Sequence, residues 1–193
     1  MIAAQLETII KQRRTHYAFD FTEQPVAETL VHQVVSSGLW APTHKMTQPW
    51  KFVLLEGAHA AELGSYMAEY YRKIYSEEEY PTERYEETKT YPLKGTLIAI
   101  IMEPGKRAQL PEWEEVAAVS CAVQNMWLTT TALGLGGYWD TGAATLAYLK
   151  EALSLSENEK CLGLFYLGHL KKKLPTVNRK RKPLSKKLSR HKR

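Results

Sequence analysis

Hydrophobic side chains recur every three or four positions along several stretches of the chain, the spacing typical of one face of a helix. The first such stretch opens the sequence, where Ile2, Leu6 and Ile9 predict a helix that ends near Gln12. The same spacing predicts further helices at 26–37, 58–75 and 113–133, and a short helix around Leu146, Leu149 and Leu153. Residues 113–133 are apolar around almost the whole circumference, so we expect that helix in the core or in a subunit interface.

Shorter apolar runs alternate with these helices. Residues 96–102 form a continuous apolar run with several β-branched side chains, which predicts a buried strand. Two more strands are predicted at 51–56, which Gly57 ends, and at 162–167, which Gly168 follows. Because helices and strands interleave, the fold class is α/β or α+β.

Residues 76–91 show neither pattern. The stretch is rich in Glu and Tyr and has no regular period, so we expect a mobile, partly helical excursion that could act as a lid. Its tyrosines could line a binding site or simply pack at the surface.

The charge is divided unevenly along the 193 residues. Residues 171–193 hold 12 Lys or Arg and no acid, whereas residues 1–170 hold 14 basic and 21 acidic residues, a net charge of −7. We therefore divide the chain into a domain at 1–170 and a basic tail at 171–193. The tail could bind nucleic acid loosely, but no motif for specific recognition supports that partner.

Composition also bounds the compartment. No apolar run approaches the roughly 20 residues that a membrane span requires, so we expect no membrane partner. The chain start lacks a signal-peptide pattern, and Cys121 and Cys161 indicate free thiols rather than a disulfide or a metal pair. These features predict a cytoplasmic protein.

A polar loop, 41–50, joins the second predicted helix to the first strand. Two prolines in it exclude a helix, because each lacks an N–H and restricts the residue before it. Between them Thr43, His44, Lys45 and Gln48 offer polar groups to a planar, anionic ligand. A structural loop with surface polar groups is the alternative.

Arg13, Arg14 and Thr15 follow the first helix directly. Two guanidinium groups and a hydroxyl can hold a phosphate, because arginine offers a fixed charge and a two-pronged set of donors. A cationic helix end that complements the helix dipole is the alternative.

A glycine-rich segment, 134–142, follows the long helix. Its glycines would let the backbone approach a ligand, and we expect Tyr138, Trp139 and Asp140 in a tight loop. The segment does not fit the dinucleotide-binding fingerprint, in which the glycines follow a strand and open a helix. An ordinary helix end and turn is the alternative.

The order of these motifs resembles the nitroreductase family. Arg-Arg-Thr after an opening helix, Ala-Pro-Thr-His-Lys-x-x-Gln-Pro-Trp before a strand, and Gly-Leu-Gly-Gly-Tyr-Trp after a long helix are similar to its small subgroup with an APxHK loop. The resemblance covers nearly all of 1–170 and part of the tail. It implies an α+β fold with a central, mainly antiparallel sheet flanked by helices, an intertwined homodimer, and two FMN sites at the dimer interface.

The resemblance also implies roles for residues. Arg13, Arg14 and Thr15 would hold the FMN phosphate and ribityl groups, and Arg181, or else Lys172, would complete phosphate binding. Trp40 and His44 would approach the same FMN from the partner, and Thr43 or Gln48 would bond ring carbonyls. Backbone amides around Tyr138, Trp139 and Asp140 would face the flavin N5 and O4 edge. Two positions depart from the subgroup, which carries Arg where this chain has Asp140 and Trp40.

The function implied is an FMN-dependent oxidoreductase. NAD(P)H would give a hydride to the flavin N5, and a nitroaromatic, quinone or similar small-molecule acceptor would then take the electrons in a ping-pong cycle. The cofactor carries this chemistry, so no side chain is expected to be catalytic. Lys45 could stabilise the reduced ring. A non-catalytic flavin sensor or carrier, which Asp140 motivates, and a nucleic-acid-binding protein are the alternatives.

Overall fold

The computed structural model describes residues 1–105, 110–172, 174 and 179–191. Its helices are α1 (Ile2–Gln12), α2 (Glu28–Gly38), α3 (His59–Ile74), α4 (Thr82–Thr90), α5 (Glu112–Ala132) and α6 (Ala143–Ala152). Its strands are β1 (Trp50–Leu55), β2 (Thr96–Met102), β3 (Leu135–Asp140) and β4 (Lys160–His169). Short 3-10 turns form η1 (Ala18–Asp20), η2 (His44–Met46), η3 (Tyr91–Lys94) and η4 (Leu184–Lys186). No helix in these described ranges is both long and apolar enough to cross a membrane.

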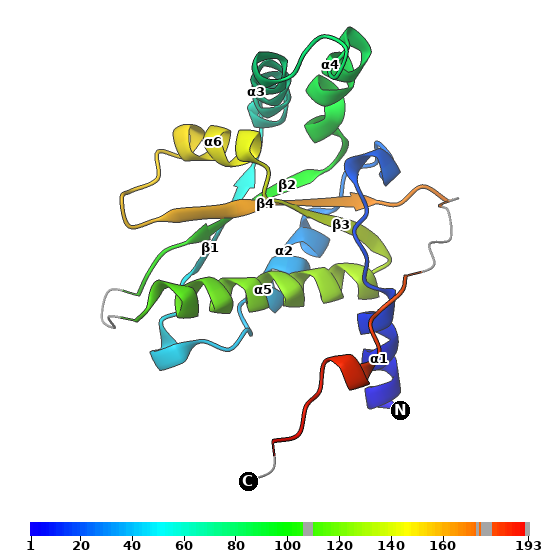
Figure 1. Ribbon diagram of the computed structural model, residues 1–193, viewed down its shortest axis with the longest axis vertical. Helices are drawn as coiled ribbons and strands as arrows, with labels where there is room; N and C mark the ends of the chain where they lie inside the picture. Colours follow the sequence, from blue (N-terminus) through cyan, green and yellow to red (C-terminus); the bar gives the residue numbers. More distant parts are fainter. Residues whose placement is uncertain (106–109, 173, 175–178, 192–193) are drawn as a thin grey trace.

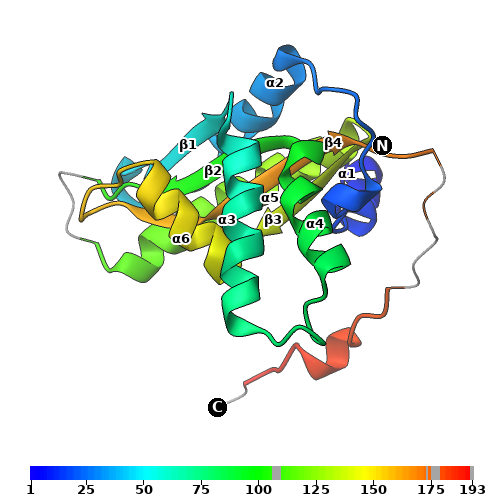
Figure 2. The ribbon, with the colours of Figure 1, turned by 90° about the horizontal axis from the view of Figure 1, so that it is seen from above.

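The strands form one sheet in the order β1-β2-β4-β3, and every neighbouring pair is antiparallel. Helices α5 and α2 cover one face, and α3 and α6 cover the other (Figure 1). Viewed from above, α3, α4 and α6 lie together over the sheet (Figure 2). This architecture confirms the mixed class with antiparallel pairing.

Burial on both faces explains why β2 is apolar throughout. Successive side chains of a strand point to opposite faces, so a strand covered on both sides needs apolar residues at every position. Leu97, Ala99 and Ile101 pack in the cluster under α3 and α6, whereas Ile98, Ile100 and Met102 pack in the cluster under α5 and α2. The predicted strand at 96–102 is therefore confirmed with its bounds.

Helix α5 confirms the long predicted helix and lies along the core. Val119, Ala122 and Met126 are buried against the sheet. Its outer side is open, because Trp113 is 69% exposed and Cys121 is exposed as well.

The tight loop predicted at Tyr138 to Asp140 is wrong. Those residues end strand β3, which pairs with β4. The glycines suggested a turn, but two of them lie within the strand, at positions with no room for a side chain. A Cβ on Gly136 would lie 2.5 Å from a carbon of Phe21, and one on Gly137 would lie 2.8 Å from a carbon of Phe165.

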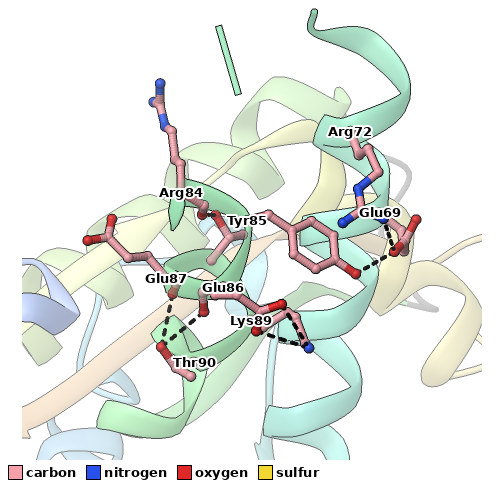
Figure 3. Close-up of polar contacts among 9 residues, drawn as sticks. Glu69, Arg72, Arg84, Tyr85, Glu86, Glu87, Lys89 and Thr90 are labelled. Carbon is pink, nitrogen blue, oxygen red and sulfur yellow. Dashed lines mark hydrogen bonds and ion pairs between the residues drawn. The ribbon is translucent and has the colours of Figure 1, made fainter. Parts of the chain in front are cut away.

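The segment 76–91 contains helix α4, which confirms its partly helical character. Close contacts hold α4 against α3 (Figure 3). The Arg72 guanidinium lies 3.6 Å from the centre of the Tyr85 ring, and the Tyr85 hydroxyl donates to Glu69 at 2.5 Å. The helix is thus a packed part of the fold rather than a separate excursion.

The contact between α3 and α4 is tightest at Gly64, where an added Cβ would lie 2.0 Å from the carbonyl oxygen of Lys89. Gly64→Ala must push the helices apart. We expect the free energy of unfolding to fall by about 1–3 kcal/mol, even though alanine favours a helix. Urea denaturation measures this change. Ser65→Ala, at the exposed neighbouring position, should stay within about 0.5 kcal/mol of the unsubstituted protein. Equal midpoints for Gly64→Ala and Ser65→Ala would contradict the close packing.

Candidate functional site

The chain after α1 runs alongside β3, the outer strand of the sheet. The amide of His16 donates to the carbonyl oxygen of Gly137 at 3.0 Å, and the rings of Tyr17 and Tyr138 have centroids 5.0 Å apart. The structure therefore brings the predicted phosphate-binding residues, 13–15, beside the predicted ring-binding strand, although more than 120 residues separate them in the sequence.

Positive charge accumulates where α1 ends. The Arg13 guanidinium lies 4.4 Å from the centre of the Trp127 ring. Arg179, from the tail, donates hydrogen bonds to the carbonyl oxygens of Lys11 and Arg13. Burial, followed by the charges of Arg179 and Arg181, lowers the pKa of Arg13. In the described ranges, no ion pair joins Arg13, Arg179 or Arg181 to a carboxylate. Such a group of cations suits an anion with several charged oxygens.

Arg179 is the tail residue that sequence reasoning missed. Of the two predicted tail cations, Arg181 is exposed and donates to the Lys180 carbonyl oxygen at 3.2 Å, with its charge acting on Arg13, and Lys172 is exposed just after β4. A signal was available, since arginine can satisfy the last carbonyl groups of a helix. Nothing in the sequence, however, pairs residue 179 with α1 in particular.

The polar loop 41–50 is a strained turn around η2. Lys45, Met46 and Gln48 have φ angles of 49°, 54° and 48°, a region that side chains other than glycine rarely adopt. The Thr43 hydroxyl oxygen holds the loop closed, because it accepts from the Gln48 amide at 3.1 Å and lies 3.0 Å from the Thr47 hydroxyl.

His44 fastens this loop to the start of α5. Its Nδ1 lies 2.5 Å from a carboxylate oxygen of Glu114. Nearby, Trp40 is 87% exposed and Met46 is 71% exposed. The loop thus presents large apolar surfaces outward beside an anchored histidine.

Within one chain the loop and the arginines stand at opposite ends of α5 (Figure 1). His44 is anchored at Glu114, and Arg13 packs on Trp127, 13 residues further along the helix. At 1.5 Å per residue these two anchors are about 20 Å apart. The structure therefore separates Thr43, His44 and Gln48 from the place where Arg13 packs. Trp40 follows the end of α2, which contacts α5 at Asn125 and Met126.

A cavity of about 320 Å³ opens beside the end of β3. Its apolar walls come from Tyr17, Phe19, Met67, Tyr71, Tyr91 and Tyr138. Tyr138 and Asp140 both line it, because alternate residues of a strand share a face. Trp139 points to the other face, where its indole N–H donates to the Leu162 carbonyl oxygen at 3.0 Å. Only the backbone of Trp139 can therefore serve a ligand in the cavity.

The Asp140 carboxylate is turned into the fold. It is 6% exposed and accepts hydrogen bonds from the Thr145 hydroxyl at 2.6 Å and the Gly142 amide at 2.8 Å. The Tyr138 hydroxyl also donates to it at 3.4 Å. Asp140 thereby fixes the turn that joins β3 to α6.

Two of the cavity tyrosines, Tyr91 and Tyr138, are proton donors at neutral pH. Burial, and then the charge of Asp140, raises the pKa of Tyr138. Burial raises the pKa of Tyr91 to about 12, with the Ala18 amide acting in the opposite direction and Asp140 in the same direction. Their hydroxyl groups thus remain protonated around a bound ligand.

Comparison with known proteins identifies the family of this chain. The model of the nitroreductase family matches residues 10–169, which is most of the chain. The chain belongs to the nitroreductase family. It is 28% identical over 146 residues to "Putative NAD(P)H nitroreductase YdjA" of Escherichia coli K12, with 75% of this chain and 77% of that protein covered.

Solved structures share the nitroreductase fold. The nitroreductase-like family protein from Bacillus cereus superposes with a TM-score of 0.76 at 24% identity, over 95% of this chain and 94% of that one. A nitroreductase with bound FMN from Bacteroides fragilis gives a TM-score of 0.66 at 21% identity, over 92% and 94% of the two chains.

The contact between the tail and α1 leads to a prediction. Arg179→Ala removes both hydrogen bonds to the α1 carbonyl groups, so the tail should leave α1 and be cut faster by trypsin, about ten-fold or more. Mass spectrometry of timed digests measures cleavage. Arg190→Ala, further along the tail, should not change cleavage elsewhere in it. Equal cleavage of the Arg179→Ala variant and the unsubstituted protein would show that this contact does not hold the tail.

Proposed function

We propose that this nitroreductase-family protein is an FMN-dependent oxidoreductase that passes a hydride from NAD(P)H, through the flavin N5, to a nitroaromatic, quinone or similar acceptor. The observation that carries the proposal is the group of cations at the end of α1, beside the tyrosine-lined cavity at the end of β3. A phosphate at the cations and a planar ring along the edge of β3, next to the cavity rather than inside it, is the pattern of FMN.

The residues present fit the phosphate. Arg13, Arg179 and Arg181 gather without a carboxylate partner among the described residues, and their mutual repulsion lowers the pKa of Arg13 in addition to burial. Like charges held together destabilise a fold unless something compensates them, and a phosphate would do so. Arg13, Arg14 and Thr15 would hold the FMN phosphate. Arg181 would add a further positive charge from the tail, which Arg179 fastens to α1.

The residues present also fit the ring. The amides around Trp139 and Asp140 stand where a strand ends, and Asp140 fixes their direction through the Gly142 amide and the Thr145 hydroxyl. Bound FMN supplies the atom that accepts and returns a hydride. The protein binds and orients the ring, and it keeps the Tyr138 and Tyr91 hydroxyl groups protonated beside it.

Each site needs a second copy of the chain. His44 is anchored about 20 Å along α5 from the place where Arg13 of the same chain packs. Trp40, Met46 and Trp113 are exposed around the loop, and Ile2, Leu6 and Ile10 are exposed on α1. Exposed apolar side chains of this size suit a subunit interface. A homodimer would bring the loop of one copy to the arginines and β3 of the other.

The contacts of Asp140 weaken the case for a sensor that has lost turnover. Its carboxylate is engaged by Thr145, Gly142 and Tyr138 rather than aimed at the place of the ring. The contact of Arg179 with α1 likewise ties the tail to the proposed cofactor site rather than to nucleic acid.

A spectrum tests the proposal directly. The purified protein should show flavin absorption bands that bleach when NADPH or NADH is added without oxygen. Arg13→Gln should weaken FMN binding about ten-fold or more, the usual loss for a charge-assisted contact. Arg72→Gln, a matched change on α3 away from the cation group, should leave FMN affinity unchanged. A colourless protein that also ignores added FMN would overturn the proposed function. Bands that neither nicotinamide cofactor bleaches would instead favour the sensor or carrier.

Mixed dimers test the shared site. Arg13→Gln alone and Trp40→Ala/His44→Ala together should each lose most NAD(P)H oxidation, because each damages both sites of its own homodimer. Co-expression should restore activity, since a mixed dimer keeps one site free of substitutions. Random pairing gives about a quarter of the original number of sites. Two variants that both substitute Arg13 are the control and should restore nothing. Failure of the complementary pair to recover would mean that one chain supplies the whole site.

A further inference from the structure

The cavity at the end of β3 combines aromatic faces with a buried charge. Five aromatic side chains line it: Tyr17, Phe19, Tyr71, Tyr91 and Tyr138. The face of an aromatic ring carries negative potential and attracts cations. Phe19 already shows this behaviour, because the Lys94 ammonium lies 5.3 Å from the centre of its ring.

The buried charge is that of Asp140, and none of the ion pairs in the described ranges involves it. The hydrogen bonds seen for it within the described residues come from neutral groups on Thr145, Gly142 and Tyr138. Its field reaches the cavity walls: after burial, Asp140 is the main cause that raises the pKa values of Tyr71 and Tyr138. A buried carboxylate without a cation is costly, which favours a ligand that brings one.

Helix α4 forms the opposite wall. Arg84, Glu87 and Thr88 line the cavity from this helix. Figure 3 shows Arg84 and Glu87 extending from the side of α4 that faces away from Tyr85 and α3. Arg84 is exposed and donates to the Glu79 carbonyl oxygen at 3.3 Å, so water screens its charge. The buried Asp140 acts through a medium of lower dielectric, so we expect its charge to have more effect inside the cavity than that of Arg84 or of Lys94, which lies against Phe19.

We propose that this cavity is an acceptor pocket that selects planar, positively charged rings, such as N-alkylated heteroaromatic or quinoid cations, over neutral and anionic rings. The inference rests on the proposed function, since the flavin would be the source of the electrons. A volume of about 320 Å³ limits the ligand to a small ring system.

Charge selection would also favour turnover. A quinoid cation that accepts a hydride gains two electrons and one proton, forms one new bond to hydrogen, and becomes neutral. Flavin bound in its reduced form would supply that hydride and would be left oxidised, which balances the two electrons. Asp140 and the ring faces attract the cation but not the neutral product, so the product leaves more readily than the substrate.

Binding without reaction tests the inference. Calorimetry on the protein with its flavin compares N-methylquinolinium with quinoline, a neutral ring of similar shape, at mildly alkaline pH. The cation should bind at least about ten-fold more tightly, the usual effect of a desolvated contact between a cation and aromatic rings. Quinoline-2-carboxylate, the anion, should bind most weakly. Equal affinities for cation and neutral ring, or a weaker cation, would overturn the inference.

Variants locate the effect. Asp140→Asn should weaken binding of the cation about ten-fold and that of quinoline much less, because it removes the charge, although it also replaces one of the two acceptor oxygens with an NH2 group. Glu87→Gln should weaken it about two- to three-fold, since this carboxylate is exposed. Glu86→Gln is the matched control: Glu86 pairs with Lys89 at 3.2 Å and does not line the cavity (Figure 3). If Asp140→Asn fails to fold, Glu87→Gln against Glu86→Gln decides the question. An equal effect in both Glu variants would contradict the pocket.

The same samples separate this inference from the proposed function. The flavin bands and their bleaching by NADPH report the oxidoreductase alone. A protein that bleaches but does not prefer the cation keeps the proposed function and refutes the inference. Preference for the cation in a protein without flavin would leave a cation-binding cavity and remove the proposed chemistry.

Discussion

The pairing of β4 with β2 on one side and with β3 on the other carries the rest of the structure. Both central strands are buried on both faces, so two layers of helices can form only around them. The same pairing carries β3, whose outer edge receives the chain after α1 through the bond between His16 and Gly137. The cation group, the cavity tyrosines and Asp140 all depend on that one edge. Glycines at 136 and 137 allow it, because side chains there would collide with Phe21 and Phe165.

The length of α5 is the second constraint. A helix of 21 residues is rigid, and it holds the His44 loop at one end and Arg13 at the other. No rotation of side chains can bring these two groups together within one chain. The proposed function therefore depends on a second copy, and the exposed tryptophans beside the loop, Trp40 and Trp113, fit that requirement.

Charge is used differently in the two parts of the proposed site. Near α1, arginines from both ends of the chain gather with no acidic partner among the described residues, which suits a phosphate. At the cavity, the buried Asp140 carboxylate helps to raise the pKa of Tyr138, and no cation among the described residues pairs with it. The proposed phosphate-binding end and the proposed cation-attracting end thus lie on either side of one strand. Asp140 has two roles, because the hydrogen bonds through which it fixes the β3–α6 turn also hold its negative charge beside the cavity.

Local pattern was enough to predict much of this protein. Periodicity gave the bounds of α1 and β2 and the course of α5, because those signals arise from side chains close in sequence. The order of the motifs indicated the family, which the match over residues 10–169 confirms. The strand at Tyr138 to Asp140 was missed because its glycines leave room for the side chains of Phe21 and Phe165, which are distant in sequence. The contact of Arg179 with α1, the inward turn of Asp140 and the separation of His44 from Arg13 were likewise decided by tertiary packing. Each joins groups that only the completed fold brings together or holds apart, and no local spacing encodes such a distance.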